Sequence, residues 1–83
     1  MTSIRYFEAQ VLRKRPYLTV DMCRSAVSNP LRREVQADGR IRHWGVVLLP
    51  NEAKPRILRV VTLEDGITLH NAFIDRNFRE ETR

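Results

Sequence analysis

Two Asp-Gly dipeptides, Asp38-Gly39 and Asp65-Gly66, set the strongest limit on how this chain can fold. Asp-Gly favours the backbone of tight hairpin turns, and each dipeptide lies between segments that alternate apolar and polar residues. A longer turn is expected at residues 50–55, which begin and end with proline. These turn signals therefore predict four antiparallel strands, which follow one another as a meander over most of the chain.

A helix is expected before the first strand. Thr19 is placed to cap its N-terminus, Asp21 suits its first turn, and Cys23 and Val27 belong to one apolar stripe. The helix should end before Pro30, because the residue before a proline avoids the helical region. Cys23 lies on the stripe, so we expect a buried structural thiol rather than a nucleophile.

The first residues allow two interpretations. Ile4, Phe7 and Val11 fall at helical spacing, which favours a helix that Pro16 would end. Phe7, Ala9 and Val11 also alternate with polar residues, as in a strand. Residues 4–13 therefore leave helix and strand open, with helix preferred.

The chain as a whole predicts a single domain over residues 1–83, of the α+β class. Two N-terminal helices would pack on one face of a four-stranded antiparallel meander sheet. No apolar run approaches the ~20 residues that span a bilayer, and the first residues lack the apolar segment of a secretory signal. We therefore expect a cytoplasmic protein that does not contact the membrane. With one cysteine, no intramolecular disulfide can form.

A two-residue loop at each Asp-Gly turn would fix which residues lie opposite each other across the sheet. It places Arg33 opposite Trp44, and Glu34 opposite His43 as a polar pair at the sheet margin. On the face that the helices cover we expect Ile41, His43, Gly45, Val47, Leu49, Leu58, Val60, Leu69, Asn71 and Phe73. On the opposite face, which too few helices remain to cover, we expect Arg33, Arg40, Arg42, Trp44, Val46, Arg59, Val61, His70 and Ala72.

The positive charge is concentrated in the first half of the chain. The net charge is +5, and residues 1–45 hold nine Lys and Arg against four Asp and Glu, whereas residues 46–83 hold six of each sign. This asymmetry favours an anionic partner, either nucleic acid or an acidic protein surface, and a solubilising surface charge is the alternative. The sequence has no glycine-rich phosphate loop, metal-ligand cluster or nucleophile–base motif, so we expect no cofactor and no metal.

His70 and Trp44 are the candidate functional residues of the uncovered face. His70 could act as a general acid or base near neutral pH, and an ordinary half-exposed strand histidine is the alternative. Trp44 could stack on a base while Arg33 contacts a phosphate, as in proteins that bind single-stranded nucleic acid. A cation–π pair that covers the sheet is the alternative for Trp44 and Arg33.

Three further residues have structural interpretations. Asn71 is expected to be buried among apolar residues and hydrogen-bonded, where it would anchor the corner after the last strand. Asp75 and Arg76 are expected to form a salt-bridged turn at that corner.

Four features follow one another along residues 18–76: an amphipathic helix opened by LT and closed by NP, a basic hairpin, the segment LRVVTLEDG, and a last strand that ends in Ala72-x-x-x-Arg76. Together they resemble the small bacterial domains related to BrnT and RelE toxins. The resemblance implies a RelE-like fold and, in the toxin branches, an mRNA-cleaving ribonuclease neutralised by an antitoxin partner.

The resemblance also implies roles for particular residues. Those toxins carry basic and aromatic side chains on the open sheet face, which stabilise charge on a scissile phosphate while a side chain moves the proton. On this chain the resemblance assigns these positions to Arg33, Arg42, Trp44, Arg59 and His70. We therefore expect His70, Arg42 and Arg59 as catalytic groups, and Arg33, Trp44 and the nearby Arg40 as groups that bind RNA or a partner.

Two functions therefore stay open. The first is an RNA-binding or RNA-cleaving protein of toxin type, which uses the basic sheet face and has an antitoxin-type partner. The second is a non-catalytic module that binds a protein partner or another copy of itself through the same face. Trp44, Val46 and Val61 motivate the second function, because a mixed apolar and basic patch often marks an interface.

Overall fold

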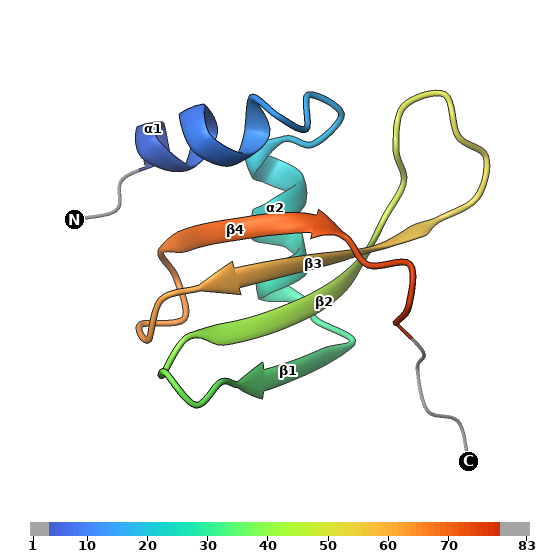
Figure 1. The fold of residues 1–83 in the computed structure, drawn as a ribbon. Coiled ribbons are helices and arrows are strands. Elements are labelled where there is room, and N and C mark those ends of the chain that lie inside the picture. Colours follow the sequence, from blue (N-terminus) through green and yellow to red (C-terminus); the bar gives the residue numbers. More distant parts are fainter. Residues whose placement is uncertain (1–3, 79–83) are drawn as a thin grey trace, which may run out of the picture.

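The computed structural model describes residues 4–78 and has an α+β architecture. Two N-terminal helical segments precede four strands, which pair antiparallel in the order of the sequence. The strands are β1 (Arg32–Val35), β2 (Ile41–Val47), β3 (Arg56–Thr62) and β4 (Leu69–Ile74). In Figure 1 the sheet lies in front of helix α2, so the helices leave one face of the sheet uncovered. The predicted helices and antiparallel meander are confirmed.

The first segment is helical, which resolves the two interpretations of residues 4–13. α1 (Ile4–Phe7) continues directly into a π-helix, η1 (Glu8–Leu12). The Arg13 amide donates to the Glu8 carbonyl at 2.9 Å, the five-residue spacing of a π-helix. Both α1 and η1 pack against β4, and their buried side chains are Phe7 and Val11.

The second helix, α2 (Val20–Ser28), has the predicted cap and end. The Thr19 hydroxyl accepts a hydrogen bond from the Met22 amide at 3.1 Å, and the helix stops before Pro30. Cys23 is fully buried, and this burial raises the pKa of its thiol to about 12. The thiol is therefore neutral core material, as expected. None of the helices between residues 4 and 78 is long and apolar enough to cross a bilayer.

Helix α2 packs closely on β2 and β3 because a glycine lies beneath it. A Cβ atom at Gly45 would lie 2.7 Å from the Ala26 Cα and 2.8 Å from its Cβ, which is closer than carbon atoms can approach. The core is one cluster that joins both helical segments to the sheet. Its buried members are Phe7, Val11, Leu18, Cys23, Ala26, Val47, Leu49, Leu58, Val60, Leu69 and Ala72.

Both Asp-Gly loops are longer than predicted. The Gln36 amide donates to the Arg40 carbonyl at 2.7 Å, which leaves three residues in the first loop, with Gly39 at φ +92°. A glycine in the left-handed region is typical of three-residue hairpin loops. In the second hairpin the Leu63 amide donates to the Thr68 carbonyl at 2.9 Å, which leaves four residues in the loop.

The longer first loop changes the register of β1 by one residue. Arg32, rather than Arg33, lies opposite Trp44, and Arg33 lies opposite His43 on the helix side. The predicted Arg33–Trp44 and Glu34–His43 pairs are therefore wrong. Across the middle turn the sequence predicts Leu49 opposite Arg56 and Trp44 opposite Val61. The structure shifts β2 against β3 by two residues from that register, so that Trp44 lies opposite Arg59. A shift of two keeps every side chain on its predicted face.

β4 starts in the predicted register and then changes face. Leu69 lies on the helix side as expected, but a β-bulge leaves His70 without an opposite residue on β3. Asn71 and Phe73, predicted in the core, therefore lie on the face away from the helices. Ala72, predicted on the uncovered face, is fully buried in the core.

Candidate functional site

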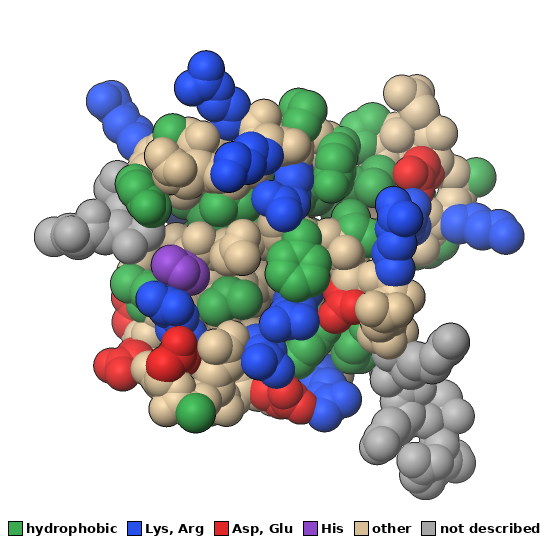
Figure 2. All heavy atoms as spheres, viewed as in Figure 1, with side chains coloured by type: hydrophobic (Ala, Val, Ile, Leu, Met, Phe, Trp, Pro, Cys, Tyr) green, Lys and Arg blue, Asp and Glu red, His purple; other side chains and the backbone are tan. Residues whose placement is uncertain are grey.

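The candidate site is the sheet face opposite α2, which we call the arginine face. Residues directly opposite each other in antiparallel strands share a face. The register therefore places two rows of side chains across all four strands: Arg32, Trp44, Arg59 and Phe73 in one row, and Glu34, Arg42, Val61 and Asn71 in the next. Figure 2 views this face, where basic (blue), acidic (red) and apolar (green) side chains lie interspersed.

Trp44 is covered by other side chains of the same chain. Its indole N–H donates to Asp75 Oδ2 at 2.9 Å, and the Phe78 ring stacks on it with centroids 5.6 Å apart and planes inclined by 27°. The guanidinium groups of Arg32 and Arg59 each lie 5.6 Å from the indole centroid. Trp44 is only 6% exposed. Trp44 therefore forms the cation–π contact that was the alternative to base stacking, and Arg32 takes the place predicted for Arg33.

Arg59 connects the aromatic residues to Asp75. Its guanidinium also lies 4.9 Å from the Phe73 ring, and its Nη1 is 3.9 Å from Asp75 Oδ2. The Nε of Arg59 is buried without a hydrogen-bond partner among the described residues. The Nε group is therefore a buried donor without a partner, which is costly, and the exposed part of Arg59 is its guanidinium end beside Asp75.

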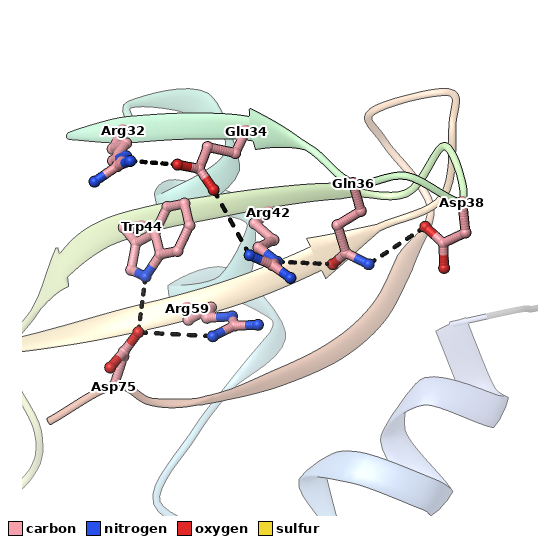
Figure 3. A network of polar contacts seen from close by, with 8 residues as sticks. All are labelled: Arg32, Glu34, Gln36, Asp38, Arg42, Trp44, Arg59 and Asp75. Carbon is pink, nitrogen blue, oxygen red and sulfur yellow. Dashed lines mark hydrogen bonds and ion pairs between the residues drawn. The ribbon is translucent and has the colours of Figure 1, made fainter. Parts of the chain in front are cut away.

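Glu34 organises the other half of the arginine face. Its carboxylate forms ion pairs with Arg32 and, at 3.6 Å, with Arg42. Arg42 Nε donates to Gln36 Oε1 at 3.1 Å, and Gln36 in turn donates to Asp38 at 3.3 Å. Figure 3 shows this chain of contacts beside the separate Trp44–Asp75–Arg59 group. The three arginines of the face share two carboxylates, so the face is far less positive than its arginine content indicates.

His70 lies in the β-bulge and is partly buried. Its neighbour Asn71 lies opposite Val61 of β3, and Arg42 of β2 lies opposite Val61 on the other side. His70 and Arg42 thus lie on the strands to either side of β3, whose backbones are roughly 10 Å apart, twice the strand spacing. The Nδ1 atom of His70 is buried and has no hydrogen-bond partner among the described residues.

Two of the predicted binding residues lie elsewhere. Arg33 is on the helix side, beside His43, whose pKa is lowered by burial and, to a lesser extent, by the Arg33 charge. His43 is 2% exposed and shares a 3.1 Å hydrogen bond with the Thr62 hydroxyl, so it is a core residue. Arg40 lies at the first hairpin turn, 3.4 Å from Asp38. The structure therefore brings together Trp44, Arg42 and Arg59 but not Arg33 and Arg40.

The predicted Asp75–Arg76 salt bridge is wrong. Asp75 instead accepts from Trp44 and pairs with Arg59, and its Oδ1 accepts from the Asn77 amide at 3.0 Å. The sequence gives no periodic signal for this arrangement, because the segment after β4 returns over the sheet. Asn71 also differs from its prediction: its side-chain oxygen accepts from the Ala72 amide at 2.9 Å on the arginine face.

A pocket of about 350 Å³ opens beside Trp44. It combines guanidinium groups, carboxylates and aromatic rings, and its lining residues are Arg32, Glu34, Trp44, Arg59, Asp75, Asn77 and Phe78. Arg32, Asp75 and Phe78 were not among the predicted site residues, and Asp75 was expected only in a turn. A three-residue first loop would have placed Arg32 opposite Trp44, whereas only the folded chain brings Phe78 to the indole.

Comparison of the chain with known protein families, with curated proteins and with solved structures finds no match. Among residues 4–78, no three His, Cys, Asp or Glu side chains are grouped so that they could hold a metal ion. The function must therefore be argued from the arginine face.

Proposed function

We propose that the protein binds single-stranded RNA on the arginine face, in the pocket beside Trp44. The main support is the composition of that pocket, where guanidinium groups, aromatic rings and carboxylates converge. Single-stranded nucleic acid is bound by cations that contact phosphates and by rings that stack on bases. Glu34 suits a different part of the ligand, because a carboxylate accepts hydrogen bonds from the amino groups of bases.

We further propose a RelE-like fold and a relation to the BrnT and RelE toxins, in which the bound RNA would be cleaved. His70 would take the proton from a ribose 2′-hydroxyl, whose oxygen attacks the adjacent phosphorus. The bond from phosphorus to the 5′-oxygen then breaks, and this oxygen takes a proton from water. Arg42 and Arg59 would stabilise the charge that builds up on the phosphate oxygens. The supporting observation is that His70 of β4 and Arg42 of β2 belong to the strands on either side of β3.

Binding is tested by titrating labelled single-stranded RNA with the wild type, Arg42→Gln and Arg24→Gln, over a range of salt concentrations. Arg24 is a matched control because it is exposed on α2, on the opposite side of the sheet. Arg42→Gln should weaken binding and lower the salt slope by about one, while Arg24→Gln should change neither. A wild type that binds no RNA at low salt would refute the proposal.

Cleavage is tested separately with labelled RNA and with DNA of the same sequence. The wild type should cleave only the RNA, because the 2′-hydroxyl is the nucleophile, and His70→Ala should abolish cleavage while RNA still binds. In cells, induction should arrest growth, and His70→Ala and Arg42→Ala should relieve the arrest. Tight binding without any cleavage would leave an RNA-binding protein and remove the ribonuclease assignment.

A second candidate function is the docking of a protein on the same face, either an antitoxin-type partner or another copy of the chain. The supporting observation is Val46, which lies on this face and is 54% exposed. Sedimentation at rising concentration tests the self-association version, in which Val46→Lys should keep the protein monomeric. A wild type that stays monomeric at high concentration excludes it.

A further inference from the structure

A second group of cations lies at the end of the sheet where β4 stops, and we call it the basic end. Its cations are Arg13, Lys14 and Arg15 after η1, Arg56 at the start of β3, and Arg76 after β4, and Tyr17 lies beside them in the turn after η1. Arg13, Lys14, Arg15 and Arg76 form no ion pair with any residue between 4 and 78. Within the part of the chain that the structure describes, Arg56 is the one cation of the basic end with a carboxylate partner, Glu52, whereas all three arginines of the arginine face are paired.

Part of the basic end is a pocket of about 210 Å³. Tyr17 from the turn after η1, Arg56 from β3 and Arg76 from the end of β4 line it, and Leu49, Pro50, Glu52 and Ile74 complete the lining. The Tyr17 ring is 41% exposed and available for contact. Glu52 is the one carboxylate in the lining, and it already holds Arg56 at 3.0 Å and 3.3 Å. The guanidinium of Arg76 is thus left for a ligand.

Two hydrogen bonds of Asp75, one from its amide and one to its side chain, hold the corner that carries Arg76. The Asp75 amide donates to the Ile57 carbonyl at 2.9 Å, and the Asp75 side chain accepts from the Asn77 amide at 3.0 Å. Asp75 lines the pocket beside Trp44, and Arg76, the next residue, lines the pocket of the basic end. The two pockets therefore meet at this corner from opposite sides of the sheet, and a ligand that occupies both must be long enough to pass round the end of the sheet.

The geometry points to a phosphate-binding site at the basic end, which takes the backbone of the same single-stranded RNA that the arginine face binds. This inference rests on the proposed function and extends it by a second contact point. Arg76 donates two parallel N–H groups to phosphate oxygens, the arrangement that guanidinium groups favour. Tyr17 stacks on the neighbouring base. Arg13, Lys14 and Arg15 add positive potential that attracts the following phosphates.

The test uses two RNA ligands and three variants. A dinucleotide can reach only the arginine face, whereas an oligonucleotide of about twelve residues can reach both sites. Arg76→Gln should weaken binding of the longer RNA roughly tenfold, lower its salt slope by about one and leave dinucleotide binding unchanged. Arg42→Gln should weaken both ligands, and Arg24→Gln, the exposed control on α2, should affect neither.

The outcomes separate this inference from the proposed function. If Arg42→Gln weakens the longer RNA and Arg76→Gln does not, the inference is overturned and the proposed function survives. If the wild type binds no RNA, both the inference and the proposed RNA-binding function are wrong. NMR titration with inorganic phosphate gives an independent measurement, in which the signals of Tyr17, Arg56 and Arg76 should shift together. Binding of an acidic peptide through Arg76, without any binding of RNA or phosphate, would overturn the inference in favour of a protein partner.

Discussion

The two faces of the sheet bury their side chains by different means. On the helix side, Leu58 and Val60 are fully buried by apolar contacts beneath α2. On the arginine face, Trp44 is almost as buried, but a carboxylate, two guanidinium groups and a phenyl ring cover it. Apolar burial is non-directional, whereas hydrogen bonds and ion pairs depend on particular partners. The helix side should therefore respond to changes of volume, and the arginine face to the loss of single polar groups.

Gly45→Ala should have the largest effect, because it adds volume where α2 touches the sheet. The new Cβ would lie 2.7 Å from the Ala26 Cα, a backbone atom that can move only if the helix moves. We expect a loss of about 3 kcal/mol in the free energy of unfolding, at the upper end for an overpacked core. Chemical denaturation measures it.

The control for this prediction is the pair Gly45→Ala with Ala26→Gly. Removing the Ala26 methyl group should recover part of the loss, although glycine inside a helix itself costs up to about 1 kcal/mol. If Gly45→Ala alone changes stability by less than about 0.5 kcal/mol, α2 does not approach the sheet as closely as the structure has it.

The sequence predicted the helix side better than the arginine face, for a physical reason. Alternation assigns side chains to faces, and the alternation of β2 survives a shift of two residues against β3. Thr19 and Pro30 mark the ends of α2 by local backbone chemistry, so they too could be recognised in the sequence.

The arginine face depends on details that alternation does not encode. Whether the first loop has two residues or three decides between Arg33 and Arg32 as the neighbour of Trp44. The bulge at His70 moves Asn71 to the arginine face, and no residue type in β4 predicts this bulge. Asp75 and Phe78 reach Trp44 only after the chain has turned back over the sheet. The candidate residues could thus be named in part, but their partners could not.

Asp75→Ala should be the most disruptive change on the arginine face. It leaves the indole N–H of Trp44 without an acceptor and removes the charge partner of Arg59, whose side chain is 25% exposed. We expect a loss of about 2 kcal/mol in unfolding free energy, the usual cost of a buried donor without a partner. Denaturation followed by Trp44 fluorescence measures both the stability and the environment of the ring.

Asp75→Asn separates the two contributions of that carboxylate. The amide oxygen can still accept from Trp44, while the ion pair with Arg59 is lost. Asp75→Asn should therefore cost clearly less than Asp75→Ala. Equal losses would mean that the charge, rather than the hydrogen bond to the indole, holds this group together.

Acidification should lower the free energy of unfolding through His43, which lies on the helix side of the sheet. Burial, followed by the Arg33 charge, lowers the pKa of His43 in the folded protein. The unfolded chain takes up a proton near pH 6.5, whereas the folded protein resists it, so stability is complete above that pH and falls below it. The slope from this group is up to about 1.4 kcal/mol per pH unit. Unfolding free energies of the wild type and His43→Gln, measured between pH 7 and about pH 5, should converge as the pH falls. A constant difference would contradict this role for His43.

Of these substitutions, Glu34→Gln should change the free energy of unfolding least, but it should change RNA binding. The Glu34 carboxylate is 37% exposed and its ion pairs are screened by water, so we expect a stability change within about 0.5 kcal/mol.

The substitution removes one of two carboxylates shared by three arginines. If the carboxylate only neutralises Arg32 and Arg42, RNA binding should become tighter, by roughly two- to fivefold at low salt. If it accepts from a base, binding should weaken for sequences that offer an amino group at that position, and the preference among bases should fade. Glu64→Gln, at the exposed second turn, controls for the change in net charge. If both variants change RNA binding equally, Glu34 acts only through the net charge of the protein. RNA would then not bind specifically at the arginine face.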